Sequence, residues 1–119
     1  MCYLSEVEEA ISFILDEGFD LEKLTVLHAT TDYPTAVSDV NLNAMNTIRQ
    51  IHSNIKVGYS DHTLSLIVPV TAVGMGASVI EKHITLDKNM AGPDHKASLD
   101  PIEFKQMVEM IREAELCLG

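Results

Sequence analysis

The chain has 119 residues, a mass of 13.1 kDa and a formal net charge of −10 at pH 7. Its 46% hydrophobic and 22% charged residues are typical of one globular domain with its own core, which argues against a disordered segment. The excess of acidic residues repels nucleic acids and anionic membrane surfaces, so neither is expected as a partner.

The first predicted helix covers residues 6–17. Ser5 and Glu8 have the spacing of a capping box at its start, apolar side chains follow at helical spacing, and Gly18 suits the left-handed position after its end. Residues 24–30, LTVLHAT, are rich in strand-forming side chains and end in hydroxyl groups. This pattern predicts the first strand.

Helices and strands alternate through the rest of the chain. Helices are predicted over residues 40–51, 65–75 and 101–118, and strands over residues 56–60 and 78–84. Strands this apolar, each separated from the next by a helix, predict a parallel sheet with right-handed helical crossovers. Because a sheet of three parallel strands leaves both edges unpaired, we infer that the chain is part of a larger α/β architecture, a (β/α)8 TIM barrel.

Polar side chains follow the second and third strands, in the segments VGYSDHT and VIEKHIT. The carboxyl ends of parallel strands open on one rim, where ligands bind. Period-two alternation places Ser60 on the same side as His62, and Glu81 on the same side as His83, while Lys82 points the other way. Two imidazoles and a carboxylate suit a divalent transition metal with open positions for water or substrate.

Other interpretations of these residues stay open. A histidine near a strand end is usually a hydrogen-bonded structural residue, so a structural role for His62 and His83 stands beside the metal site. His28, in the middle of a strand, is interpreted as a core histidine with a satisfied hydrogen bond, and His52 as a solvated residue of a turn. The aperiodic loop of residues 86–100 is either a binding loop at the rim or a solvated connector.

The segments TTDYP, VGYSDHT and IEKHITLDKNMAGPDHKASLDP, in this order, resemble the sialic acid synthase (N-acetylneuraminate synthase) family along nearly the whole chain. Enzymes of this family are transferases that condense phosphoenolpyruvate with N-acetylmannosamine or a related amino sugar, release phosphate and form a nine-carbon sialic-type acid. The resemblance implies that residues 1–119 are a single segment, a partial (β/α)8 TIM barrel with the last three parallel strands and their helices. The antifreeze-like C-terminal domain of the relatives is expected to be absent.

The resemblance also implies roles for individual residues. His62 and His83 match the two protein ligands of a divalent metal, manganese, and Glu81 matches a catalytic residue close to that metal. The implied substrate contacts are Ser60 to phosphoenolpyruvate, Thr31 and Tyr33 to phosphoenolpyruvate and sugar, and Asp94 to a sugar hydroxyl.

Two parts of the family's site are expected to lie outside this chain: lysines from earlier strands that hold the phosphate, and a domain that caps the site of a homodimer partner. The chain alone is therefore expected to be inactive, and the full-length protein to be a homodimer. Two alternatives stay open, a non-catalytic fragment that folds as an oligomer and a metal-dependent aldolase that does not use phosphoenolpyruvate. The sugar is N-acetylmannosamine or the diamino sugar of legionaminic or pseudaminic acid, and two histidines accept several divalent metals.

The cellular location is inferred from the cysteines and the chain start. Cys2 and Cys117 lie at opposite ends with neither a disulfide nor a metal-binding spacing, which fits a reducing compartment. The first residues are acidic where a secretory signal is basic, and the longest apolar run, residues 64–80, is interrupted by Pro69 and polar residues. A cytoplasmic location is expected.

Overall fold

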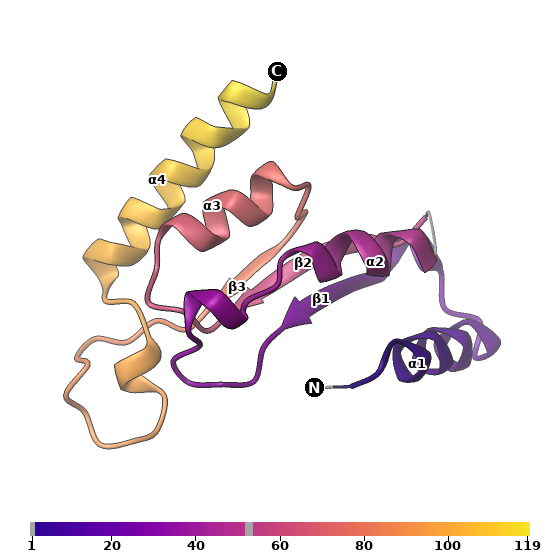
Figure 1. Ribbon diagram of the computed structural model, residues 1–119, viewed down its shortest axis with the longest axis horizontal. Coiled ribbons are helices and arrows are strands. Elements are labelled where there is room, and N and C mark those ends of the chain that lie inside the picture. Colours follow the sequence, from indigo (N-terminus) through magenta and orange to yellow (C-terminus); the bar gives the residue numbers. More distant parts are fainter. Residues whose placement is uncertain (1, 52–53) are drawn as a thin grey trace.

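A computed structural model describes residues 2–51 and 54–119, so the predicted solvation of His52 lies outside the described residues. The helices and strands in chain order are α1 (Leu4–Asp16), β1 (Thr25–Ala29), α2 (Asn43–Ile51), β2 (Lys56–Asp61), α3 (Ile67–Gly74), β3 (Ile80–Lys82) and α4 (Pro101–Leu118). Short 3-10 helices occupy Leu21–Lys23, Val37–Asp39 and His95–Ala97. The predicted alternation of helix and strand is confirmed (Figure 1).

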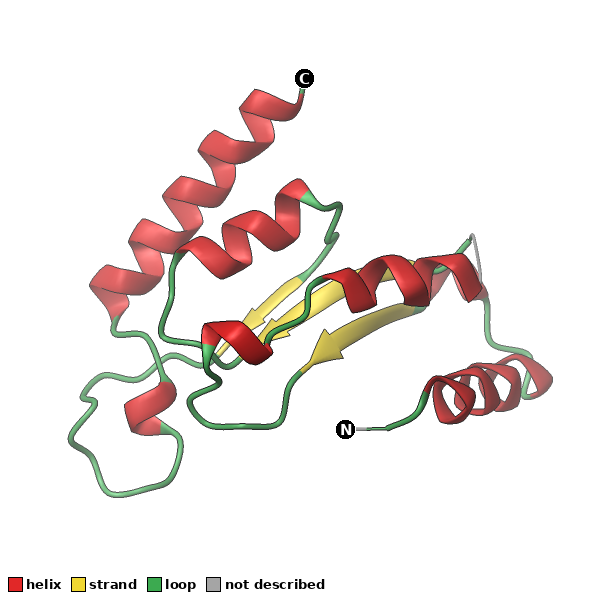
Figure 2. Cartoon of the chain, in the orientation of Figure 1, coloured by secondary structure: helices red, strands yellow, loops and turns green. Residues whose placement is uncertain are grey.

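The sheet has three parallel strands in the order β1-β2-β3, as predicted from the alternation. The register pairs Ala29 with Ser60 and Ser60 with Glu81. All three strands point the same way, so their carboxyl ends, with the loops that follow, lie on one side of the molecule, called the rim below (Figure 2). Among residues 2–51 and 54–119 no further strand covers the outer edge of β1 or β3.

The third strand is shorter than the predicted residues 78–84. Regular pairing with β2 ends at Lys82, and Ile84 instead forms an isolated parallel bridge with Leu99. The amide of Leu99 donates to the carbonyl of His83 at 3.0 Å, and the amide of Thr85 donates to the carbonyl of Leu99 at 2.9 Å. The chain of β3 separates from β2 after Lys82 because the returning loop, rather than a neighbouring strand, bonds to the backbone of His83 and Thr85.

The main core lies between the sheet and the helices α2 and α3. Its buried apolar residues are Val40, Met45, Ile48, Val57, Tyr59, Val68 and Ala72. Val57 and Tyr59 of β2 point to this helix face, so Gly58 and Ser60 point to the opposite face. A second cluster joins α3 to α4 through Val73, Leu99, Met107 and Ile111.

Close packing on the sheet face opposite the helices explains why residue 58 is a glycine. A Cβ atom at this position would lie 2.5 Å from Cδ2 of Leu27 and 2.5 Å from the carbonyl oxygen of Val79. The neighbouring strands therefore approach too closely for any side chain here.

The predicted capping box of Ser5 and Glu8 is wrong. The helix α1 begins at Leu4, so Ser5 already has helical backbone, and the amide of Tyr3 donates to the carboxylate of Glu6 instead. The end of α1 is as expected, with Gly18 at φ 82° and its amide bonded to the carbonyl of Leu15.

The later helices also start differently from their predicted bounds, except for α4. The helix α2 starts at Asn43 rather than at residue 40, because Asn41 adopts a positive φ of 47° between a 3-10 turn and the helix. The helix α3 starts at Ile67, whose amide donates to the Ser65 hydroxyl. The helix α4 starts at the predicted residue 101, where the Asp100 carboxylate is the N-cap and accepts from the amides of Ile102 and Glu103. None of the described helices has the length and apolar character needed to cross a bilayer.

Candidate functional site

Two histidines lie just beyond the ends of β2 and β3, and an aromatic ring lies against both. The ring centroids of His62 and His83 are 5.3 Å apart, with the rings inclined at 64°. Tyr33, in the loop after β1, has its ring 4.2 Å from His62 and 5.7 Å from His83. His62 is buried and His83 is partly exposed. Three separate strand ends therefore meet at this point, called the histidine site below.

A backbone carbonyl determines which nitrogen of His62 carries the proton. The Nδ1 atom lies 2.8 Å from the carbonyl oxygen of Thr30. A carbonyl oxygen only accepts hydrogen bonds, so Nδ1 carries the proton and Nε2 keeps its lone pair. A carbonyl partner of this kind orients metal-ligating histidines and fixes their tautomer.

Ser60 and Glu81 form a second pair on the same face of the sheet. They are direct partners in the ladder between β2 and β3, and the Ser60 hydroxyl donates to Oε1 of Glu81 at 2.7 Å. Ser60 is buried whereas Glu81 is exposed. His62 follows Ser60 by two residues, and His83 follows Glu81 by two residues. The four side chains therefore form two rows, one along each strand, that lead to the rim.

The donor set fits a metal held by two protein ligands. No group of three or more histidine, cysteine, aspartate or glutamate side chains suited to a metal occurs among the residues that the structure describes. Glu81 is therefore not gathered with the two histidines as a third ligand, and its carboxylate is engaged with Ser60 instead. Two imidazoles that leave other positions to water or substrate are a chemically reasonable set for a divalent ion.

The remaining predicted site residues lie in exposed loops of the rim. Thr31 is exposed in the loop that also carries Tyr33, two residues after the end of β1. Asp94 is exposed in the long loop after β3, where its carbonyl accepts from the Ser98 hydroxyl at 2.7 Å. This loop is fixed to the segment after His83 because Nδ1 of His95 lies 2.8 Å from the Thr85 hydroxyl. Figure 1 shows the loop extending from the carboxyl end of β3.

A buried ion pair lies on the other side of the same two strands, and the sequence analysis did not identify it. Nζ of Lys82 is 2.8 Å from Oδ2 of Asp61, with side chains 1% and 0% exposed, and it also donates to the carbonyl of Thr63. Oδ1 of Asp61 accepts from the Tyr59 hydroxyl at 3.2 Å and from the Thr63 amide at 2.9 Å. Burial, and then the charge of Asp61, raise the pKa of Tyr59, so this hydroxyl remains a donor.

The sequence did contain a signal for this pair. In SDH and EKH the residue before each histidine carries a charge, and the two charges are opposite. Aligning the motifs on adjacent strands would have placed Asp61 beside Lys82.

His28 has the structural role that was predicted for it. Its Nε2 lies 2.7 Å from the carbonyl oxygen of Val40, and its ring lies 5.8 Å from that of Tyr59. His28 is thus a hydrogen-bonded residue of the helix side and does not contribute to the rim.

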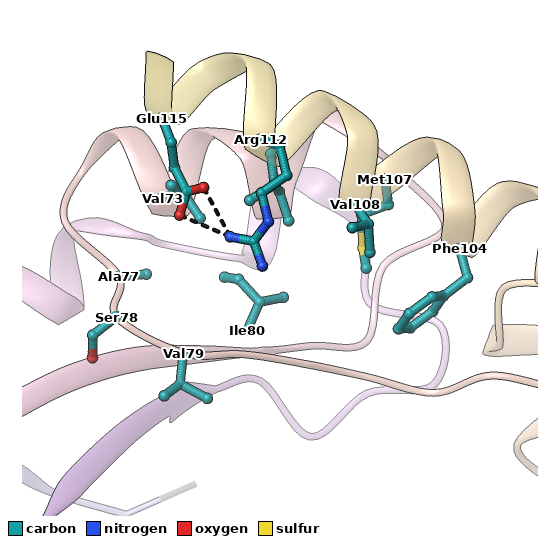
Figure 3. A pocket seen from close by; sticks show the side chains of 11 residues that line it. Val73, Ala77, Ser78, Val79, Ile80, Phe104, Met107, Val108, Arg112 and Glu115 are labelled. Carbon is teal, nitrogen blue, oxygen red and sulfur yellow. Dashed lines mark hydrogen bonds and ion pairs between the residues drawn. The ribbon is translucent and has the colours of Figure 1, made fainter. Parts of the chain in front are cut away.

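Two cavities lie away from the histidine site. One, of about 200 Å³, lies between α3, α4 and the start of β3, and Arg112 reaches over it to bind the Glu115 carboxylate at 2.8 and 3.0 Å (Figure 3). The other, of about 630 Å³, lies between α1, β1 and α2. Neither has His62 or His83 among its lining residues.

Comparisons with known proteins give a consistent result. A model described as "NeuB family" matches residues 1–119. The chain is 52% identical over 121 residues to the N,N'-diacetyllegionaminic acid synthase of Legionella pneumophila, which covers 100% of this chain and 34% of that protein. The chain thus spans about a third of the length of the curated relatives it matches.

Two solved structures have the same arrangement of elements. A spore coat polysaccharide biosynthesis protein from Bacillus subtilis superposes with a TM-score of 0.92 at 36% identity, covering 98% of this chain and 32% of that one. An N-acetylneuraminic acid synthetase from Leptospira borgpetersenii superposes with a TM-score of 0.90 at 32% identity, covering 100% of this chain and 40% of that one.

Proposed function

The chain belongs to the NeuB family, as its resemblance to sialic acid synthases predicted, and from this premise we propose the reaction of the protein that contains it. The protein condenses phosphoenolpyruvate with N-acetylmannosamine or a related N-acetylated amino sugar, forms a nine-carbon sialic-type acid and releases phosphate. The observation that carries this proposal is the histidine site, where His62, His83 and Tyr33 meet from three strand ends.

The three strands are proposed to be the last three of a (β/α)8 TIM barrel. Helices α2 and α3 cover one face, and the other face carries Gly58, Ser60 and Glu81. Within residues 2–51 and 54–119 both outer strand edges are uncovered, which is what a segment of a closed barrel requires. The face with Ser60 and Glu81 would then line the barrel, and the histidine site would lie at its catalytic rim.

His62 and His83 are proposed to hold a divalent ion, with manganese as the first candidate. The proton on Nδ1 of His62 leaves Nε2 free for this purpose, and the ring of Tyr33 lies tilted against His62 and edge-on to His83. An ion bound here supplies Lewis-acid polarisation of the aldehyde oxygen of the open-chain sugar.

Other residues of the rim have roles in the condensation. The enol carbon of phosphoenolpyruvate attacks the aldehyde carbon, water adds to the resulting cation, and phosphate leaves. The attacking water must lose a proton and the aldehyde oxygen must gain one as it becomes a hydroxyl. The Glu81 carboxylate, exposed beside the site, is proposed to take up the first proton and to supply the second. Ser60, which donates its one hydroxyl proton to Glu81 in this structure, is proposed to turn it to phosphoenolpyruvate when that substrate binds.

The exposed loops of the rim are proposed to position the two substrates. Thr31 and Tyr33 are assigned to phosphoenolpyruvate and sugar, and Asp94 to a sugar hydroxyl. Their exposure leaves the side chains accessible to ligands. Holding both substrates in one orientation is the main advantage of such a site for a two-substrate reaction.

The charge of the chain indicates that the phosphate is held by other parts of the protein. The formal net charge is −10, and the cations Lys82, Lys88 and Arg112 are already paired with carboxylates. A phosphate needs cationic donors that this segment does not offer in excess. Residues 1–119 alone are therefore proposed to be inactive, and the complete enzyme to act in the cytoplasm as a homodimer.

The direct test is phosphate release by the whole protein from phosphoenolpyruvate, with manganese and N-acetylmannosamine or the corresponding diamino sugar. Replacing His62 by Ala should lower the rate at least about 100-fold, whereas His28→Gln, which keeps a donor toward Val40, should change it little. Full activity of the His62→Ala variant would refute the proposed site. Sugar turnover without phosphoenolpyruvate would favour an aldolase, and a folded oligomer without any turnover would favour a non-catalytic role.

A further inference from the structure

The ion pair of Asp61 and Lys82, called the buried pair below, joins β2 to β3 at the residue that precedes each histidine. The two residues are partners in the parallel ladder, and their charged atoms are 2.8 Å apart. Their side chains are 0% and 1% exposed, on the helix side of the sheet. We propose that the buried pair is a positioning device that sets the separation of the His62 and His83 imidazoles, an inference that rests on the proposed metal site.

The buried pair closes the regular ladder between β2 and β3. The register between β2 and β3 pairs Tyr59 with Ile80 and Ser60 with Glu81, and the buried pair is the last match before the strands separate. Each histidine is the next residue along its strand. Because successive residues of a strand point to opposite faces, fixing Asp61 and Lys82 on the helix side directs both imidazoles to the other side.

The backbones of the two histidines are bonded to different parts of the chain. The carbonyl of His62 accepts from the amide of Thr35 at 2.9 Å, whereas the carbonyl of His83 accepts from the amide of Leu99 at 3.0 Å. The backbone of His62 is thus held by the loop after β1, and the backbone of His83 by the loop before α4. The buried pair is the nearest side-chain bond that connects one strand end directly to the other.

Several directional hydrogen bonds hold the buried pair. The Asp61 carboxylate accepts from Lys82, from the Tyr59 hydroxyl and from the Thr63 amide, and Lys82 also donates to the Thr63 carbonyl. The network therefore holds the residues on both sides of His62. Apolar side chains in this place could give equal stability but would allow several arrangements, because they lack directional bonds.

The test separates the positioning role from a purely structural one by a double variant of the whole protein. Asp61→Asn with Lys82→Met removes both charges together, keeps an oxygen that accepts from Tyr59 and Thr63, and keeps most of the lysine stem. The matched control is Lys105→Met with Glu109→Gln, which removes an exposed pair on α4 with a separation of 3.6 Å.

The measurements are the affinity for Mn²⁺ by electron paramagnetic resonance, the visible spectrum with Co²⁺, and the unfolding temperature. The double variant should unfold within a few degrees of the wild type, bind Mn²⁺ about 10- to 100-fold more weakly and show a changed Co²⁺ spectrum. The control pair should change none of these quantities.

Wild-type Mn²⁺ affinity and an unchanged Co²⁺ spectrum in the double variant would overturn the inference. In that case, loss of binding in His83→Ala would show that the proposed metal site itself still stands. If the wild-type protein binds no Mn²⁺, the metal site and the inference fall together. If the double variant does not fold, Tyr59→Phe removes one bond to Asp61 and should weaken Mn²⁺ binding about threefold; unchanged binding would contradict the inference.

Discussion

The two sides of the β2 and β3 ends differ sharply although they are made by alternate residues of the same strands. On the helix side, Asp61 and Lys82 are sealed from solvent and bonded to each other. On the rim side, Glu81 is exposed and His83 is partly exposed, within reach of a ligand. One side therefore holds the strands in place, while the other is available for chemistry. Substitutions on the two sides should therefore affect different properties.

The largest effect is expected from removing one member of the buried pair. Lys82→Met leaves the Asp61 carboxylate buried without a counter-charge, which should lower the free energy of unfolding by about 3–5 kcal/mol. Urea denaturation of the whole protein measures this loss. Adding Asp61→Asn should restore most of the stability. A loss below about 1 kcal/mol for the single variant would show that the pair is not isolated from water as the structure indicates.

Gly58 is a structural residue in the middle of β2, on the sheet face that also carries Ser60 and Glu81. Gly58→Ala places a methyl group against Leu27 and the backbone of Val79, so the strands must shift, at a cost of about 1–3 kcal/mol. Gly74→Ala is the matched control, since its Cβ would meet no atom within 4 Å in α3 and alanine favours a helix. Equal unfolding temperatures for the two variants would argue against the close approach of β1, β2 and the segment before β3.

A substitution of Ser60 tests the sheet face that carries the proposed substrate contacts. Ser60→Ala removes the donor to Glu81, and because that carboxylate is exposed, the free energy of unfolding should fall by no more than about 1 kcal/mol. Phosphate release should nevertheless decrease about tenfold, mainly through a higher KM for phosphoenolpyruvate. Steady-state kinetics of the variant and the wild type would measure this change in KM. An unchanged KM together with a large loss of stability would assign Ser60 to the structural side.

The smallest expected effect lies outside both regions, at the start of α4. The hydrogen bond from Lys88, followed by the bond from the Asp100 amide, lowers the pKa of Glu103. A lowered pKa in the folded state gives stability that is present above the unfolded value of about 4.3 and is lost as the pH falls through the folded value. Glu103→Gln should therefore cost at most about 1 kcal/mol near pH 7, and the difference from the wild type should disappear in acid.

Denaturant titrations at pH 7 and at about pH 3 would measure this difference. A cost for Glu103→Gln that persists unchanged at the lower pH would contradict the charged interaction with Lys88, and would leave the capping bond to Asp100 as the main contribution.

Local patterns were sufficient to predict the order of elements, the parallel sheet and the grouping of the site. Period two placed His62 and His83 on one side and Lys82 on the other, and the structure agrees. The partner of Lys82 was missed because period two fixes which face a side chain points to but not the register between strands. The register that pairs Ser60 with Glu81 is a tertiary property, and it brings Asp61 to Lys82.

Element boundaries were predicted less well than the elements themselves. The early end of β3 depends on Leu99, which returns from a loop far along the chain to bond His83 and Thr85. The start of α1 depends on Glu6 reaching the Tyr3 amide, which competes with the equally plausible box of Ser5 and Glu8. In both cases several bonding arrangements satisfy the sequence pattern, and packing selects one.

The most direct test of the central claim is Mn²⁺ binding to the whole protein by electron paramagnetic resonance, with the wild type beside His83→Ala. If His62 and His83 hold the ion, the wild type binds Mn²⁺ and His83→Ala loses at least about 100-fold in affinity while remaining folded. Equal binding by both proteins, or no binding by the folded wild type, would contradict this role of the two histidines. His62 and His83 would then be structural residues that meet at the rim without holding a metal.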